Sequence, residues 1–295
     1  MKILILGGDG MLGHQLLKLL RERHDVKVTL RQEFASYAGV GLFTPENSFA
    51  GVDLRVSDRL LAVLADFHPD ALVNAAGIVK QRPDGLDVIP NLEINALLPH
   101  RLALICAATG ARLVHISTDC VFSGNRGQYR EDDVPDPVDI YGHSKLLGEV
   151  TQQRVITLRT SIIGRSLYRS ASLIDWFLRQ QGRIKGYRNA IFSGFTTKEV
   201  SRVIAHLLER PSAASGLYHL SSSAISKYDL LMHLRDRLAR SIEIVPDDSV
   251  RIDRSLDSSR FRAEFAYTPP SWDVMLKELA EDIKANAASN AAVVA

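Results

Sequence analysis

Short β-rich runs and longer helical patterns alternate along the first half of the chain, and this alternation restricts the fold more than any other feature. The patterns predict strands at 3–6, 26–30, 71–75, 113–117 and 155–159. They predict intervening helices at 12–22, 58–67, 92–109 and 141–151. Ser57 is expected to cap the second of these helices. Because helical crossovers join parallel strands, we predict an α/β fold with helices on both faces of a doubly wound parallel sheet.

The rhythm changes after residue 159. Helical patterns at 172–179, 198–208 and 228–238 are separated by short strand-like runs, such as 217–220 and 242–245. We therefore expect a smaller, mixed C-terminal lobe that binds the substrate. The predicted boundaries are a first domain at 1–165 that elements within 190–222 rejoin, a lobe mainly at 166–285, and a frayed Ala/Asn-rich tail at 286–295.

Composition excludes several classes of protein. The 295 residues are 46% hydrophobic, too apolar for a disordered chain, and 36 basic against 34 acidic residues leave a net charge of +2, which disfavours a nucleic-acid or membrane-surface partner. Cys106 and Cys120 make no disulfide framework, and the nine histidines show no metal-ligand spacing, so we predict no metal. No run approaches the roughly 18 apolar residues of a membrane span, and the first apolar run is too short for a signal-peptide core. We expect a cytoplasmic protein.

A glycine-rich turn from Gly7 to Gly13 follows the first predicted strand and opens the first predicted helix. Glycines let a pyrophosphate approach the backbone, and the helix N-terminus offers free N–H groups. The string fits a pattern that starts at Gly8 or one that starts at Gly7, and the turn alone does not choose between them. In this position the turn predicts a Rossmann-type dinucleotide site, with contacts from Gly7, Asp9, Gly10, Met11, Leu12 and Gly13.

The end of the second strand indicates which dinucleotide binds. NAD sites commonly carry an acidic residue there, whereas this chain has Arg31. A guanidinium pairs well with a 2′-phosphate, so we predict NADPH as the cofactor, with NADP preferred over NAD. Asp53, followed by Leu54, is a candidate contact for the adenine amino group. The strand predicted at 71–75 ends in small residues that leave room for the dinucleotide, namely Asn74, Ala75, Ala76 and Gly77.

Tyr141 and Lys145 are four residues apart on a predicted helix, so their side chains share one face. At roughly 6 Å, the lysine charge is expected to lower the pKa of the phenol by about two units. A phenol with this lower pKa suits a general acid that gives a proton to the alkoxide formed by hydride transfer. Thr118 follows the strand predicted at 113–117, at the sheet edge where such folds bind ligands, and its hydroxyl is expected to form a hydrogen bond with the reacting oxygen.

The glycine turn, Thr118, the Tyr141/Lys145 helix and their order resemble the extended short-chain dehydrogenase/reductase family over most of the chain. Residues 117–124, 141–149 and 256–259 most resemble its dTDP-4-dehydrorhamnose reductase branch. The resemblance implies that NADPH delivers hydride to the 4-keto group of a nucleotide-linked deoxysugar. Tyr141 would then be the proton donor, Lys145 would tune it and hold the ribose, and Thr118 would orient the keto oxygen. The same resemblance selects Gly7, rather than Gly8, as the first glycine of the motif.

Pro99 lies four residues after Asn95 and lacks an N–H, so in a helix the Asn95 carbonyl loses its usual partner. Two interpretations stay open. The proline simply kinks the helix, or the free carbonyl faces the site and holds a water on a proton path to Lys145.

Several positions depart from the rhamnose-forming pattern. Ile162 stands where that branch has a tryptophan, and Cys120 replaces an aromatic residue. The resemblance therefore fixes the reaction type better than the sugar, and a related amino- or deoxy-ketosugar on dTDP or UDP fits the chain. A diphosphate favours cationic contacts. The expected substrate contacts are Asp119, Lys80, Arg82, Ile162, Arg183, Lys185 and Thr197.

Two other functions remain open at this stage. One is a sugar-nucleotide epimerase or dehydratase of the same family with tightly bound NAD. A dehydratase needs an acid/base carboxylate pair, and Cys120 follows Asp119 where similar enzymes have glutamate. The other is a cofactor-binding protein without activity. The resemblance also implies a homodimer in which the helices at 92–109 and 141–151 pair across a two-fold axis.

Overall fold

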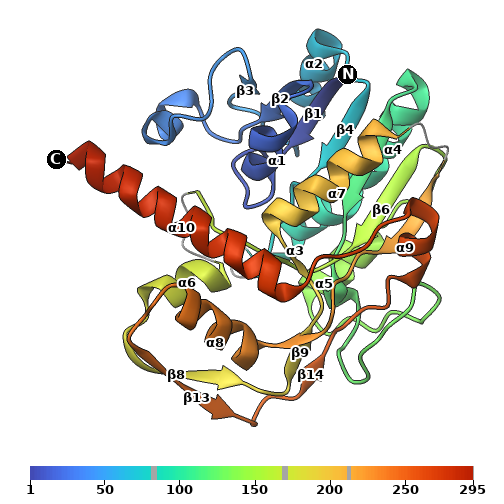
Figure 1. The fold of residues 1–295 in the computed structure, drawn as a ribbon. Helices are drawn as coiled ribbons and strands as arrows, with labels where there is room; N and C mark the ends of the chain where they lie inside the picture. The colour runs from blue at the N-terminus through green and yellow to red at the C-terminus, as the bar shows by residue number, and fades with distance from the viewer. Residues whose placement is uncertain (81–84, 168–171, 211–213, 295) are drawn as a thin grey trace.

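A seven-stranded, all-parallel sheet forms the centre of the computed structural model, which describes residues 1–80, 85–167, 172–210 and 214–294 (Figure 1). The strand order is β11-β6-β5-β4-β1-β2-β3, which reverses direction beside β1. The predicted doubly wound α/β sheet is thereby confirmed. Its strands are β1 (Lys2–Leu6), β2 (Asp25–Thr29), β3 (Ser48–Phe49), β4 (Ala71–Asn74), β5 (Arg112–Ile116), β6 (Val155–Arg159) and β11 (Gly216–His219).

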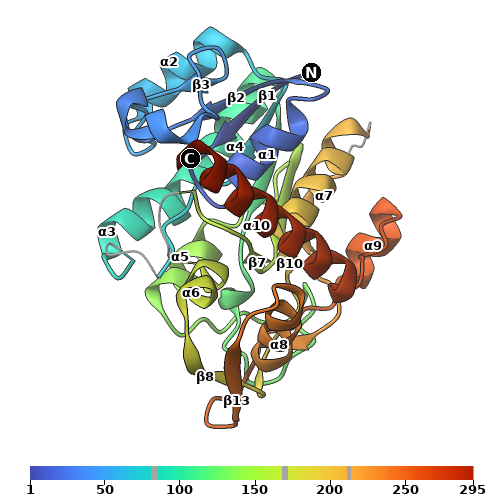
Figure 2. The ribbon, with the colours of Figure 1, turned by 60° about the vertical axis from the view of Figure 1, so that its left-hand side comes forward.

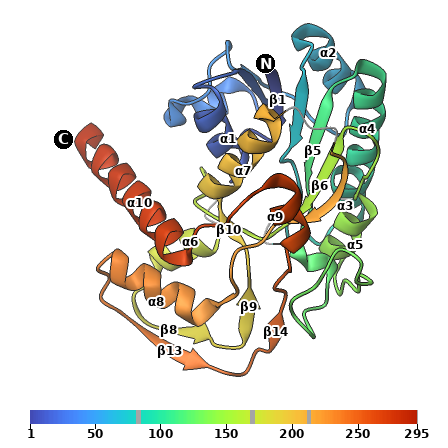
Figure 3. The same cartoon turned by 45° about the vertical axis from the view of Figure 1, so that its right-hand side comes forward.

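Alternate residues of the central strands supply two separate hydrophobic cores. Ile3 and Ile5 of β1 pack beneath α1 (Gly13–Leu20) and α7 (Thr197–Glu209). Leu4 and Leu6 face the other way and pack beneath α2 (Ser57–Phe67) and α4 (Leu98–Thr109). A strand with buried side chains on both faces reads as a continuous apolar run, as this one does. Figure 3 shows α1 and α7 on one side of the strands and α4 on the other.

The second lobe is built from short strands and helices that lie at the carboxyl edge of the large sheet (Figure 2). Its small sheets have the orders β10-β7, β12-β9-β14 and β13-β8. The chain leaves the large sheet after β6 and returns through α7 and β11. The strands of the lobe are β7 (Ile162–Ile163), β8 (Gly182–Tyr187), β9 (Ala190–Phe192), β10 (Phe195–Thr196), β12 (Ile225–Ser226), β13 (Ile242–Asp247) and β14 (Ile252–Asp253). Its helices are α6 (Leu173–Arg179), α8 (Lys227–Arg237), α9 (Ser259–Phe265) and α10 (Trp272–Val294).

Helix boundaries differ from the predictions at three places. The helix expected at 92–109 is divided into α3 (Val88–Asn91), a π-helical turn η2 (Leu92–Leu97) and α4, because a wider turn accommodates the missing N–H of Pro99. Ser57 is the first residue of α2 rather than its cap, since Val56 already holds the extended cap conformation. Helix α5 (Ile140–Leu147) ends earlier than expected, at Gly148.

The tail also differs from the prediction. The backbone of α10 is helical to Val294, which includes nearly all of the segment that we expected to fray. Alanine has the highest helix propensity, and the tail is rich in it. Figure 1 shows this end of α10 reaching past the lobe. Among the described residues, none of the helices has the combination of length and apolar character that a bilayer crossing requires.

Candidate active site

A cavity of about 670 Å³ runs along the carboxyl edge of the large sheet and continues beneath the second lobe. Open parallel sheets bind their ligands at this edge, beside the reversal in strand order. Most of the residues predicted from the sequence line this one cavity. They are Gly7, Asp9, Gly10, Met11, Leu12, Arg31, Asp53, Leu54, Ala75, Ala76, Gly77, Lys80, Thr118, Asp119, Tyr141, Lys145 and Ile162.

The glycine turn has the shape that a pyrophosphate needs. Gly7 adopts a φ of +82°, in the left-handed region, and both Gly7 and Gly10 line the cavity. Gly13 lies behind them, where a Cβ would approach the Gly7 carbonyl oxygen to 2.1 Å. Gly8 instead faces β2, where a Cβ would lie 2.4 Å from the Cβ of Val28. The structure therefore distinguishes the glycines that face a ligand from those that permit packing, and the residues present fit a dinucleotide.

One end of the cavity is lined by two arginines, Arg31 and Arg55. Asp53 also lies there, and its side-chain hydrogen bond with Arg55 holds the pKa of the carboxyl below its usual value. Tyr37, on the 3₁₀ helix η1 (Phe34–Val40), donates a hydrogen bond to Asp9 Oδ2 at 3.1 Å. The sequence analysis missed Tyr37 and Arg55. The only indication of Arg55 in the sequence was its position two residues after Asp53, and no local pattern indicated Tyr37.

Thr118, Tyr141 and Lys145 meet in the middle of the cavity. Thr118 caps the short helix η3 (Asp119–Val121), and its Oγ1 accepts a hydrogen bond from the Cys120 N–H at 3.1 Å. Tyr141 lies in the first turn of α5. A Cβ on Gly142 would lie 2.4 Å from the Cys120 carbonyl oxygen, so the glycine after Tyr141 permits α5 to approach η3 closely. This packing brings the phenol beside the threonine.

Burial controls the ionisation of these groups. It raises the pKa of the Tyr141 phenol, and the hydrogen bond with Thr118 only partly opposes that rise. The expected two-unit drop in this pKa is therefore wrong, because burial disfavours the phenolate and the neighbouring Cys120 and Asp119 add to the rise. Lys145 is itself buried, which lowers its pKa to about 8 against the opposing charge of Glu149. Its Nζ donates to the Ile116 carbonyl oxygen at 2.5 Å.

Asn95 does not line the cavity, although we predicted that it would contact the cofactor. Its Oδ1 accepts from the Ile78 N–H and its Nδ2 donates to the Ile78 carbonyl, each at 2.9 Å, and Nδ2 also donates to Ser144 Oγ at 3.1 Å. A Cβ on Gly148 would lie 1.9 Å from the Asn95 carbonyl oxygen. This carbonyl faces Gly148 at the end of α5, the helix that carries Lys145, and the water relay to Lys145 stays a prediction.

Asn74 and Gly13 are also absent from the cavity wall. Asn74 ends β4 as a buried residue, and its Nδ2 lies 3.1 Å from Nδ1 of His115, its neighbour on β5. Successive side chains of a strand point to opposite faces, and this one points beneath the cavity floor. The backbone that follows at Ala75 forms the wall instead.

The predicted substrate residues separate into two groups. Lys80, Asp119 and Ile162 line the cavity, whereas Thr197 is buried in the first turn of α7. Arg183 and Lys185 lie on β8, more than two-thirds exposed, in ion pairs with Glu243 and Asp247 of β13. These two are surface residues because β8 and β13 pair with each other on the outside of the lobe. Arg82 lies outside the described residues.

The lobe wall contains residues that the sequence analysis did not find. Lys227 follows β12 and Arg254 follows β14, and both line the cavity. Phe192 of β9 adds an aromatic ring to the same wall. No local motif marks any of the three, because short strands far apart in the sequence bring them together.

A family model described as the RmlD substrate binding domain matches residues 1–285. The chain belongs to the RmlD substrate binding domain family. The resemblance stated from the sequence is thereby confirmed. In this chain, the glycine turn lines the same cavity as Thr118, Tyr141 and Lys145.

Individual relatives differ in how much of the chain they share. Methionine adenosyltransferase 2 subunit beta of Bos taurus is 33% identical over 150 residues, which cover 50% of this chain but only 41% of that protein. Spore coat polysaccharide biosynthesis protein SpsK of Bacillus subtilis is 28% identical over 95% of this chain and 97% of its own. The crystal structure of dTDP-4-dehydrorhamnose reductase from Bacillus anthracis in complex with NADP has a TM-score of 0.79 at 21% identity, covering 95% of this chain and 99% of that one.

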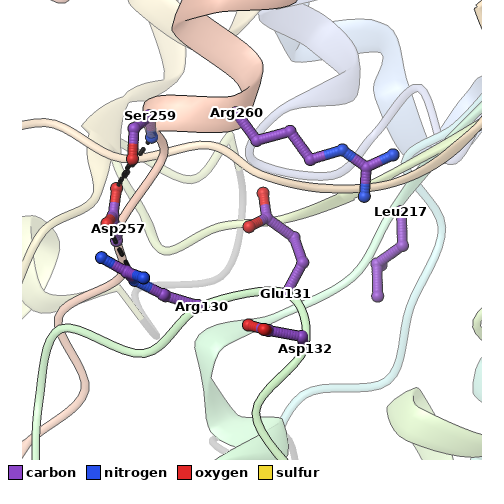
Figure 4. Close-up of a pocket in the computed structure, with 7 residues that line it drawn as sticks. All are labelled: Arg130, Glu131, Asp132, Leu217, Asp257, Ser259 and Arg260. Carbon is purple, nitrogen blue, oxygen red and sulfur yellow. Dashed lines mark hydrogen bonds and ion pairs between the residues drawn. The ribbon is translucent and has the colours of Figure 1, made fainter.

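A second, smaller pocket of about 480 Å³ lies near the β11 edge of the sheet (Figure 4). Its charged groups satisfy one another. Arg130 pairs with Asp257 at 3.4 Å, and Glu131 accepts the His219 backbone N–H at 2.8 Å. In Figure 4 the labelled side chains come from two loops, β11 and the start of α9, and the catalytic group is not among them. We assign no chemistry to this pocket.

Proposed function

We propose that this chain is an NADPH-dependent reductase of a 4-keto group on a nucleotide-diphosphate deoxysugar, with Tyr141 as the proton donor. One observation carries the proposal, namely that Thr118, Tyr141 and Lys145 line the same cavity as the glycine turn and Arg31. Short-chain reductases need such a group beside a dinucleotide, since hydride transfer to a carbonyl leaves an alkoxide that requires a proton.

Each residue has a definite task in this proposal. The cofactor supplies the hydride that reaches the carbonyl carbon. Thr118 orients the carbonyl oxygen, and the Tyr141 hydroxyl gives its proton to that oxygen as the alkoxide forms. The raised pKa of Tyr141 keeps the phenol protonated at neutral pH, which suits an acid. Lys145 holds the ribose and, when charged, stabilises the phenolate that remains.

The choice of NADPH rests on the charge at one end of the cavity. Arg31 and Arg55 both line it, and guanidinium groups favour a 2′-phosphate over a free hydroxyl. The Bacillus anthracis reductase, whose fold this chain shares, was crystallised in complex with NADP.

The direct test is NADPH oxidation measured against dTDP-, UDP- and GDP-linked 4-ketosugars. We expect turnover with one nucleotide series, and faster turnover with NADPH than with NADH. Absence of turnover with every ketosugar, by protein that binds NADPH, would overturn the proposal.

A family epimerase or dehydratase with retained NAD is the second candidate. The absence of a glutamate at position 120 disfavours elimination, because Cys120 cannot serve as a carboxylate acid/base. Cofactor extraction from freshly purified protein separates the two. A reductase is expected to purify without a bound nicotinamide cofactor, whereas an epimerase is expected to retain stoichiometric NAD.

A binding protein without turnover is the third candidate, favoured by the similarity to methionine adenosyltransferase 2 subunit beta. Such a protein would bind NADP and oxidise none in the presence of any ketosugar. Retention of both Tyr141 and Lys145 in the cavity favours the enzyme.

We also propose a cytoplasmic homodimer. Leu97 on η2, Leu104 on α4 and Leu147 on α5 are exposed by 49%, 71% and 61%, and paired helices across a two-fold axis would cover them. Light scattering after size exclusion should give twice the monomer mass, and Leu104→Glu should halve it. Cell fractionation tests the location.

A further inference from the structure

Two positively charged residues of the second lobe, Lys227 and Arg254, line the cavity near Ile191 of β9. Ser226 and Asp253 both pair with Ile191, from β12 and from β14 respectively. Lys227 follows Ser226 at the end of β12, and Arg254 follows Asp253 at the end of β14. Both line the cavity, as Ile191 does. Because β12 runs antiparallel and β14 parallel to β9, Lys227 lies toward Ala190 and Arg254 toward Phe192, so strand pairing places one positive charge on each side of Ile191.

No ion pair involves Lys227 or Arg254 among the residues that the structure describes. Arg254 Nε donates to the Phe122 carbonyl oxygen at 2.8 Å, which aims the guanidinium, and Nη1 lies 3.7 Å from Cys120 Sγ. Lys227 occupies the first turn of α8, where the helix dipole disfavours a positive charge.

Charged groups of both signs surround Lys227 and Arg254. Lys80 lines the same cavity and pairs with Asp139 at 3.2 Å. Burial and the charges of Lys80 and Arg254 lower the pKa of Lys227, while Asp119 opposes them. Asp119 is itself buried, which raises the pKa of its carboxyl. Lys80 is compensated by Asp139, and the charge of Arg254 lowers the pKa values of the Asp119, Asp136 and Asp139 carboxyls, so Lys227 and Arg254 are the two cations that an anion can still join in an ion pair.

We propose that Arg254 and Lys227, with Lys80, form an oxyanion subsite that selects substrates with an anionic group close to the reacting carbonyl. This inference rests on the proposed function, because it concerns the substrate of that same cavity. The contact of Arg254 with Cys120, two residues after Thr118, sets the subsite beside the reacting group rather than at the Arg31 end. The chemistry is that of a carboxylate or a phosphate, which a guanidinium fork binds with two parallel hydrogen bonds.

The first experiment measures the subsite without turnover and uses sulfate as the probe. Thermal unfolding of the full chain is compared in sodium sulfate and in sodium chloride at equal ionic strength. Sulfate stabilises most proteins by exclusion, so the informative quantity is its excess effect on wild type over the variants. We expect Arg254→Met and Lys227→Met to lose that excess, and Arg254→Lys to keep part of it.

The matched control is Arg251→Met, since Arg251 is exposed and lies outside the cavity wall three residues before Arg254. It should retain the full sulfate effect. Equal sulfate effects in wild type, Arg254→Met and Lys227→Met would overturn the subsite. This outcome leaves the proposed function standing, because it involves no reduction.

The second experiment identifies the source of the anion. Binding of UDP-glucose and UDP-glucuronate to NADP-loaded protein is measured by calorimetry. If the anion is a sugar carboxylate, UDP-glucuronate binds more tightly than UDP-glucose, and Arg254→Met removes that advantage, about tenfold for one charge-assisted contact. If Arg254→Met weakens both ligands equally, the cations bind the diphosphate at C1, and selection for an anion beside the reacting carbonyl is overturned. Unchanged affinity for both ligands would overturn the proposal.

Discussion

The two walls of the cavity are constructed in different ways. The wall formed by the large sheet uses residues that directly follow its strands, including Gly7, Arg31 and Thr118. The wall formed by the second lobe uses Phe192, Lys227 and Arg254, which adjoin or belong to three short strands paired side by side. The first wall consists of contiguous motifs, and the second exists only after remote segments have paired.

This difference separates chemistry from selectivity. Parallel strands end at a common edge, so each motif that follows a strand reaches the site whatever the lobe does. The lobe wall instead depends on the register of β9 with β12 and β14. A chain of this family can thus keep its hydride and proton chemistry while its lobe changes the substrate. Four predictions test this division, each with a control elsewhere in the molecule.

Tyr141→Phe should have the largest effect. Loss of the proton donor is expected to reduce turnover by about 10²–10⁴-fold, the usual range for general-acid catalysis, with NADPH affinity almost unchanged. Stopped-flow NADPH oxidation and fluorescence titration measure the two quantities. Tyr187→Phe, on β8 and away from the cavity wall, is the control. Full turnover by Tyr141→Phe would remove the phenol from the mechanism.

Lys145→Met should stabilise the cofactor-free protein. Burial lowers the pKa of Lys145 from 10.5 to about 8, so below pH 8 the folded state holds a charge that costs about 3 kcal/mol. That penalty is full below pH 8, fades as the pH rises from 8 to 10.5, and disappears above. Denaturant unfolding at several pH values measures the difference from wild type.

The control for this prediction is Lys18→Met, an exposed lysine of α1. It should change the free energy of unfolding little at any pH. A stabilisation by Lys145→Met that stays constant between pH 7 and 10.5 would contradict the buried charge.

Gly13→Ala tests the contiguous wall through packing alone. The new Cβ would lie 2.1 Å from the Gly7 carbonyl oxygen, so the turn must move. We expect a loss of roughly 1–3 kcal/mol of stability and a clear fall in NADPH affinity. Gly39→Ala is the control, because a Cβ there meets nothing within 4 Å. Unaltered NADPH binding by Gly13→Ala would show that the turn does not hold the pyrophosphate.

Arg31→Asp should have the smallest of the four effects. Replacing a cation with an anion at the 2′-phosphate end is expected to lower the NADPH-to-NADH ratio of kcat/KM by about tenfold or more, without removing the chemistry. Arg183→Met, in a surface ion pair on β8, should leave both the ratio and the rate as they are. An unchanged ratio in Arg31→Asp would assign the preference to Arg55 or to neither arginine.

Prediction from sequence succeeded where a residue's role follows from its neighbours along the chain. Strand periodicity, the glycine turn and the spacing of Tyr141 and Lys145 are local properties, and all of them were recognised. The pKa of Tyr141 was not, because it depends on desolvation by segments far away in sequence. The buried position of Asn95 behind the cavity wall was not predicted either, since it depends on the packing of η2 against α5.

The amino-acid sequence alone predicted the parallel sheet, and it also predicted the glycine turn and the group of Thr118, Tyr141 and Lys145, which line one cavity. Only the tertiary structure decided which cations line the cavity, namely Lys227 and Arg254 rather than Arg183 and Lys185. The physical reason is that a parallel sheet gathers the ends of its strands at one edge by geometry. A lysine or arginine on a short lobe strand, in contrast, reaches the cavity or the solvent according to which strands pair beside it.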